Sequence, residues 1–108
     1  MNIYERFRLD GKVAVVTGGS KGIGKGIALA FADCGADVVI IARGQKDSES
    51  VVKEIEAKGQ KSMAISADVM DFESIPKALD RVCKEMGRLD IMVNNAGGNL
   101  DRKMHALP

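Results

Sequence analysis

Glycines are concentrated in one short segment of the chain, and their spacing could hold a phosphate group. The segment reads Thr-Gly-Gly-Ser-Lys-Gly-Ile-Gly and spans residues 17–24. Glycine has no Cβ, so backbone N–H groups in such a turn can approach an anion closely. An apolar run at 13–16 and an apolar-periodic stretch after the segment predict a strand before the turn and a helix after it. The amino end of a helix attracts anions, so we interpret the segment as a cradle for a dinucleotide diphosphate.

Within this segment, each residue type indicates a role toward the cofactor. Gly18, Gly22 and Gly24 are the glycines that allow close backbone approach. Ser20 could hydrogen-bond a phosphate or the adenosine ribose, and it could also cap the following helix, since the two roles are compatible. Ile23 is expected to line the diphosphate and nicotinamide side, while its N–H faces the anion.

A second segment, Leu-Asp-Ile-Met-Val-Asn-Asn-Ala-Gly at residues 89–97, has the pattern of a buried strand with a polar, small-residue exit. Asn94 and Asn95 at that exit could tie neighbouring strands together and contact the ribose. Ala96 and Gly97 are small enough to leave room for the cofactor. The two segments are therefore expected to line one binding crevice.

Strand and helix patterns alternate along the rest of the chain. Strands are expected at about 12–17, 37–42, 62–67 and 89–94, and helices at about 22–34, 48–58 and 71–86. This alternation predicts an α/β fold with right-handed crossovers: a doubly wound, Rossmann-type parallel sheet, βαβαβαβ, with strand order 3-2-1-4. Both glycine-containing exits then open at the topological switch point, where ligands bind in such sheets.

Helix patterns also predict which side chains face the sheet. The stripe expected for the first helix consists of Ile23, Ile27, Phe31 and Cys34. Cys34 and Cys83 fall on apolar faces and are expected to be buried free thiols, because their spacing suits neither a metal site nor a redox pair. Asp71 is the expected N-cap of the third helix, although Pro76 could displace its start by a few residues.

The glycine pattern at 17–24 and the Asn-Asn-Ala-Gly at 94–97 together resemble the short-chain dehydrogenase/reductase family, including its 3-oxoacyl-ACP reductase-like members. Asp68 and Val69 match that family's adenine-binding position. The resemblance implies that the Asp68 carboxylate accepts a hydrogen bond from the adenine amino group and that Val69 packs against the ring. It also implies cofactor contact for Asn95 more than for Asn94.

The end of the second expected strand favours NADP over NAD. In NAD sites an acidic side chain at this position binds the ribose hydroxyls. This strand ends Ile-Ala-Arg and has no acidic side chain there. Arg43 could instead meet a 2′-phosphate through two hydrogen bonds. Lys21 is the second cation that NADP-preferring members of the family often carry. The alternative is that both are solvated surface charges.

The resemblance covers the chain from about Leu9 onward, and only the N-terminal half of such an enzyme. Reduction in this family uses a Tyr-x-x-x-Lys pair and a Ser. The single tyrosine here, Tyr4, precedes the first strand and has Arg8 at the fourth position after it. No catalytic residue and no metal ligand is therefore assigned. Residues 1–108 are interpreted as the NADP-binding Rossmann half of a single-domain reductase, truncated before its catalytic and oligomerisation half.

Two functions remain open from the sequence. The first is the cofactor-binding part of an NAD(P)(H)-dependent oxidoreductase that interconverts a small-molecule carbonyl, a ketone or 3-oxoacyl thioester, and an alcohol. Its full-length form is expected to be a homo-oligomer. The alternative is a non-catalytic nucleotide-binding fragment with a structural or regulatory role. The mass of the intact polypeptide would distinguish them, since a single-domain enzyme of this kind is larger than 108 residues.

Charge and hydropathy argue against other partners. The chain has 16 Lys and Arg against 15 Asp and Glu, a formal net charge of +1, which gives no electrostatic case for nucleic acid or acidic membranes. No apolar stretch approaches the roughly 20 residues of a membrane-spanning helix. The amino terminus lacks the apolar region of a signal peptide, so a cytoplasmic location is expected.

Overall fold

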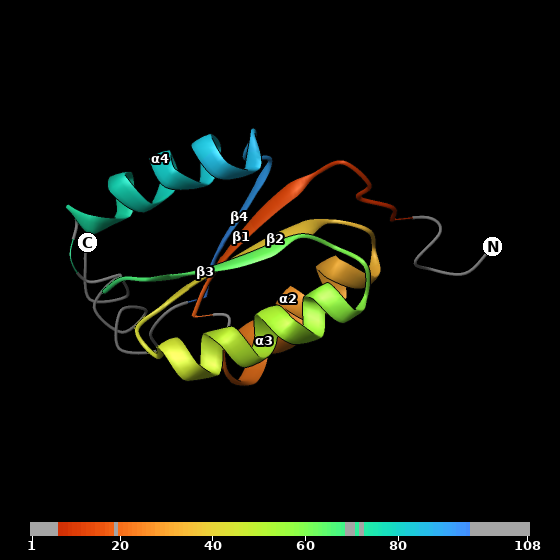
Figure 1. Ribbon diagram of the computed structural model, residues 1–108, viewed down its shortest axis with the longest axis horizontal. Helices are drawn as coiled ribbons and strands as arrows, with labels where there is room; N and C mark the ends of the chain where they lie inside the picture. Colours follow the sequence, from red (N-terminus) through yellow and green to blue (C-terminus); the bar gives the residue numbers. More distant parts are fainter. Residues whose placement is uncertain (1–6, 19, 69–70, 72, 96–108) are drawn as a thin grey trace, which may run out of the picture.

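The computed structural model describes residues 7–18, 20–68, 71 and 73–95. Strands and helices alternate along the chain (Figure 1). The strands are β1 (Val13–Thr17), β2 (Asp37–Ala42), β3 (Ser62–Ser66) and β4 (Ile91–Asn94). The helices are α2 (Gly22–Asp33), α3 (Gln45–Ala57) and α4 (Ser74–Met86). Within the described parts of the chain, no helix has the length and apolar character needed to cross a membrane.

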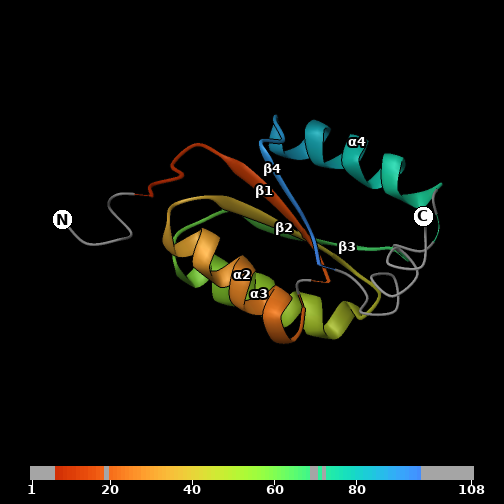
Figure 2. The ribbon, with the colours of Figure 1, turned by 180° about the vertical axis from the view of Figure 1, so that it is seen from behind.

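All four strands are parallel and form one sheet in the order β3-β2-β1-β4, which confirms the predicted topology. In the register of the central strand, Val15 lies opposite Val39 of β2 and Met92 of β4. Figures 1 and 2 show α2 and α3 together on one face of the sheet and α4 on the other. The direction of the crossovers therefore changes at β1, so β1 and β4 flank the switch point.

Two apolar cores lie on the two faces of the sheet. Along β2, Val38 and Ile40 belong to the core under α2 and α3, while Val39 and Ile41 belong to the core under α4. All four side chains are fully buried. A strand covered on both faces needs apolar residues at every position, which explains the unbroken apolar runs of β1 and β2.

The buried face of α2 differs from the predicted stripe. It consists of the small residues Gly24, Ala28 and Ala32, which recur every fourth residue. Ile27 and Phe31 are partly buried at the margin of the core, whereas Ile23 is 77% exposed. Spacing alone could not separate the two faces. Small side chains let the helix axis approach the sheet closely, and the larger ones then cover the flanks.

Helix α4 begins later than expected, at Ser74, and Asp71 is not its N-cap. Asp71 instead accepts a hydrogen bond from the Glu73 N–H through Oδ1, at 3.0 Å, in the turn before the helix. Pro76 explains the shift because proline lacks an N–H and is tolerated only in the first turn, where that donor has no helical partner. Starting at Ser74 places Pro76 in the first turn.

Two further expectations about helices are wrong in detail. Helix α3 begins at Gln45, with Gly44 at its N-cap position, and not at Ser48. Cys83 is exposed and Cys34 only half-buried, so neither thiol is fully buried. The neighbour of Cys83, Val82, fills the buried position, and one residue is a rotation of about 100° around a helix, which turns Cys83 toward solvent.

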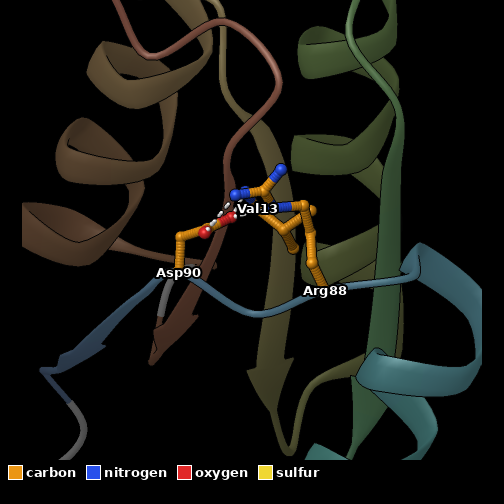
Figure 3. Close-up of polar contacts among 3 residues, drawn as sticks. All are labelled: Val13, Arg88 and Asp90. Carbon is orange, nitrogen blue, oxygen red and sulfur yellow. Dashed lines mark hydrogen bonds and ion pairs between the residues drawn. The ribbon is translucent and has the colours of Figure 1, made fainter.

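Asp90 joins the amino ends of β1 and β4 (Figure 3). Its Oδ2 accepts a hydrogen bond from the Val13 N–H at 2.9 Å, and its own N–H donates to the Val13 carbonyl at 2.9 Å. Arg88 donates two hydrogen bonds of 2.7 Å to the same carboxylate. The Arg88 guanidinium, and then the Val13 N–H, hold the pKa of Asp90 below its ordinary value of 3.8. The carboxylate thus stabilises the register of β4 on β1 in its charged form.

We predict that Asp90→Ala destabilises the chain at neutral pH and that the destabilisation shrinks in acid. A carboxyl group with a lowered folded-state pKa contributes stability above its unfolded value, and that contribution is lost as the pH falls through the folded value. Urea unfolding of wild type and variant between pH 7 and about pH 2.5 measures this. Asp80→Ala, which removes an exposed carboxylate from α4, is the control. An unfolding difference between wild type and Asp90→Ala that does not change with pH would contradict the assignment.

Candidate functional site

The Thr17 hydroxyl joins the carboxyl ends of β1 and β4. Thr17 is 1% exposed, and its Oγ1 lies 3.0 Å from Asn94 Oδ1 and 3.3 Å from the Val93 carbonyl, to which it can donate. The same oxygen accepts a hydrogen bond of 2.9 Å from the Asn95 N–H. Asn94 and Asn95 therefore tie the two strands together, as expected. The sequence interpretation gave Thr17 no role, although a polar residue that ends a fully buried strand is a signal for one.

The glycine turn after β1 packs directly beside this junction. Gly18 and Gly22 have φ of 66° and 55°, in the left-handed region that favours glycine. The Gly18 N–H donates to the Ile41 carbonyl of β2 at 2.8 Å, which anchors the turn to the sheet. A Cβ on Gly24 would clash with the Gly18 carbonyl and lie 2.5 Å from the side-chain nitrogen of Asn95. The turn, the first turn of α2 and the exit of β4 thus meet at Gly24.

The amino end of α2 carries no side-chain cap. Its N-cap residue is Lys21, not Ser20, and the Lys21 side chain makes no capping hydrogen bond. The capping role considered for Ser20 is therefore wrong. The first turn also contains no acidic residue. The side chain of Ile23 in that turn is exposed. Uncapped N–H groups and the helix dipole make this end suitable for a phosphate.

Both cations of the predicted site are paired with carboxylates. Arg43 follows β2, and its Nη2 lies 2.9 Å from Asp68 Oδ2 after β3. Lys21 Nζ lies 3.2 Å from Oδ2 of Asp47, in the first turn of α3. All four side chains are substantially exposed. The structure thus brings Arg43 beside Asp68, and it adds Asp47 beside Lys21.

Some predicted residues cannot be placed. Val69, Ala96, Gly97 and Tyr4 lie outside the described residues. Among the residues that are described, no group of three or more His, Cys, Asp or Glu side chains is arranged to hold a metal ion.

The arrangement fits a dinucleotide. Gly24 lies close to the Gly18 carbonyl and to the side-chain nitrogen of Asn95, and the uncapped helix end beside it offers the backbone N–H donors that a diphosphate needs. Asp68 lies after β3 and Arg43 after β2, on the side of β1 where the adenosine end of a dinucleotide binds in doubly wound sheets. The residues present can thus bind and orient such a molecule.

Comparison with known proteins identifies the family to which this chain is similar. The family model described as short chain dehydrogenase matches residues 12–108. Versicolorin reductase stcU of Emericella nidulans is 43% identical over 98 residues, which cover 90% of this chain and 37% of that protein. Other curated relatives are likewise matched over 31% to 37% of their lengths. The chain thus spans about a third of the length of these relatives.

Solved structures show the same fold with either cofactor. A short chain dehydrogenase from Burkholderia cenocepacia in complex with NADP is 48% identical, with a TM-score of 0.80 over 87% of this chain and 40% of that one. Carveol dehydrogenase from Mycobacterium avium in complex with NAD is 30% identical, with a TM-score of 0.79 over 83% of this chain and 37% of that one.

We predict opposite effects for alanine at two glycines of α2. Gly24→Ala places a Cβ against backbone and destabilises the chain by roughly 1–3 kcal/mol, as overpacking does. Gly26→Ala, in the same helix, meets nothing within 4 Å and stabilises by up to about 1 kcal/mol through helix propensity. Denaturant unfolding of both variants measures the difference. Equal effects at the two positions would show that the contact at Gly24 does not limit packing.

Proposed function

The chain belongs to the short-chain dehydrogenase family, and on that premise we propose that it forms the NADP-binding half of an oxidoreductase that interconverts a carbonyl and an alcohol. The observation that carries the proposal is the junction at Thr17, which brings the glycine turn of β1 against the polar exit of β4 at the switch point. The reductase and dehydrogenase among its relatives support an enzyme over a non-catalytic nucleotide-binding module.

In this proposal the chain's own residues bind and orient the cofactor, which supplies or accepts the hydride when bound. The N–H groups at the amino end of α2 bind the diphosphate. Asp68 accepts from the adenine amino group, and Asn95 contacts the ribose. The full set of proposed contacts is Gly18, Ser20, Lys21, Gly22, Ile23, Gly24, Arg43, Asp68, Val69, Asn95, Ala96 and Gly97. The substrate is a small ketone or 3-oxoacyl thioester, or the corresponding alcohol.

We further propose that NADP is preferred over NAD. Strand β2 ends at Ala42 and is followed by Arg43, so the end of the strand itself offers no acidic side chain to the ribose hydroxyls. Arg43 and Lys21 are exposed, and surface ion pairs are weak, so a 2′-phosphate can compete for both cations. The relative solved with NADP supports this choice, although the one solved with NAD shows that the fold accepts either cofactor.

In the full-length protein, Arg43→Asp is expected to weaken NADPH binding about tenfold and to improve NADH binding. Lys21→Ala is expected to weaken NADPH more than NADH. A charged hydrogen bond contributes about 1.5–3 kcal/mol, and exposure reduces each contact to the low end of that range. Calorimetric titration of both cofactors measures the ratio. Lys25→Ala, one turn further along α2, is the control. The assignment fails if wild type binds both cofactors equally or if neither variant changes the ratio.

We also expect the 108-residue chain alone to show no turnover of carbonyl compounds with NADPH. Its single tyrosine, Tyr4, has Arg8 where the family's pattern requires a lysine. Without a tyrosine acid activated by a lysine, no proton donor serves the carbonyl oxygen. Reduced-nicotinamide absorbance across a panel of ketones and thioesters measures this, with the full-length protein as positive control. Substrate-dependent oxidation by a chain of verified mass would overturn the expectation.

A further inference from the structure

Asp47 is a carboxylate at the proposed 2′-phosphate position that has no assigned role. Its Oδ2 lies 3.2 Å from Lys21 Nζ, which belongs to the turn after β1. A Cβ on Gly44, the residue after Arg43, would lie 3.5 Å from the same oxygen. The Asp47 carboxylate is therefore beside the turn after β1 and beside the exit of β2, the two segments that carry the proposed phosphate-binding cations.

We infer that Asp47 is a specificity-determining residue that limits the preference for NADP over NAD. This inference rests on the proposed function. The carboxylate holds the Lys21 ammonium and also repels a phosphate placed nearby, so the 2′-phosphate gains less from Lys21 than the lysine alone would provide. Asp47 is 51% exposed and Lys21 79% exposed, so the phosphate can displace the pair. The repulsion remains, because Asp47 is anchored in the first turn of α3.

The ion pair of Arg43 with Asp68 also lies at the proposed 2′-phosphate position, and it brings the affinities for NADP and NAD closer together. Arg43 is held by Asp68, so the two cations face two carboxylates and the four charges cancel. These four side chains therefore bring no net charge to a 2′-phosphate. Asp68 has a proposed contact with adenine, which NAD and NADP share. Asp47 differs because its charge affects only the 2′-phosphate, which NADP carries and NAD lacks.

A purely structural role for Asp47 makes a different prediction. An acidic residue in the first turn stabilises a helix through the dipole, and Asp47 is the acidic residue in the first turn of α3. Loss of that stabilisation would change the affinities for NAD and NADP together. A change in their ratio requires that the Asp47 charge acts on the 2′-phosphate.

The test is calorimetric titration of the full-length protein with NADP and NAD, without any substrate. Asp47→Asn is expected to raise the affinity for NADP about three- to tenfold and to leave the affinity for NAD within about twofold. The gain should decrease as salt is raised from about 0.05 to 0.5 M, because the interaction is between exposed charges. Asp47→Glu, which keeps the charge, should retain a ratio close to that of wild type.

Glu54→Gln is the matched control. Glu54 lies on the same helix and pairs with Lys25 at 3.1 Å, one turn of α2 beyond Lys21. The Glu54→Gln substitution removes the same charge and should leave the affinities for NAD and NADP within about twofold of the wild-type values. Equal changes for both cofactors in Asp47→Asn, no change, or the same gain in Glu54→Gln would overturn the inference. If wild type binds neither cofactor, the proposed function itself fails. NAD binding by the variant also reports that it is folded, and Asp47→Ser provides a second neutral replacement.

Discussion

The parallel pairing of β1 with β4 is the constraint on which the candidate site depends. These strands are separated by two strands and three helices in the sequence, yet they lie side by side with Thr17 opposite Asn94. Side chains secure both ends of the pair. Asp90 binds the Val13 backbone at the amino end, and the Thr17 hydroxyl joins Asn94 and Asn95 at the carboxyl end. A slip of one residue would turn the asparagines away from the glycine turn.

The two layers of helices depend on the same pair of strands. Helices α2 and α3 cover one face and α4 the other, so the chain leaves β1 and arrives at β4 from opposite sides of the sheet. The described helices cover the faces of the sheet, so within the described residues the exits of these two strands are left for a ligand. The small buried face of α2 contributes as well. Gly24, Ala28 and Ala32 let the helix lie close enough that its uncapped amino end borders the junction.

Positive and negative side chains are paired near the exits of β1 and β2. Two of the described cations near the exits of β1 and β2 are paired with carboxylates from neighbouring elements: Lys21 with Asp47 and Arg43 with Asp68. The pairs are exposed and contribute little to folding stability. They matter for binding because a charged ligand must displace these ion pairs. The affinity for a phosphate at this position therefore depends on the carboxylates as much as on the cations, which a search for basic residues alone does not reveal.

The sequence by itself determined the order of strands, the glycine turn and the polar exit of β4. These depend on local patterns: apolar runs for strands buried on both faces, and glycine where the backbone needs positive φ or close approach. It misjudged features that depend on competition between neighbours. Spacing placed Ile27 and Phe31 in the buried stripe of α2, but the sheet selects the alanines because they allow closer packing. It placed the start of α4 at Asp71, and Pro76 moved that start to Ser74.

Only the tertiary structure decided which side chains meet. Thr17 and Asn94 are 77 positions apart in the chain, and Lys21 precedes α2 whereas Asp47 belongs to α3. Periodicity specifies which face of its own element a residue occupies. It does not specify the partner across the sheet or between helices, because that depends on register and on the distance at which two elements pack. The junction at Thr17 and the charge partners of the two cations follow from packing for this reason.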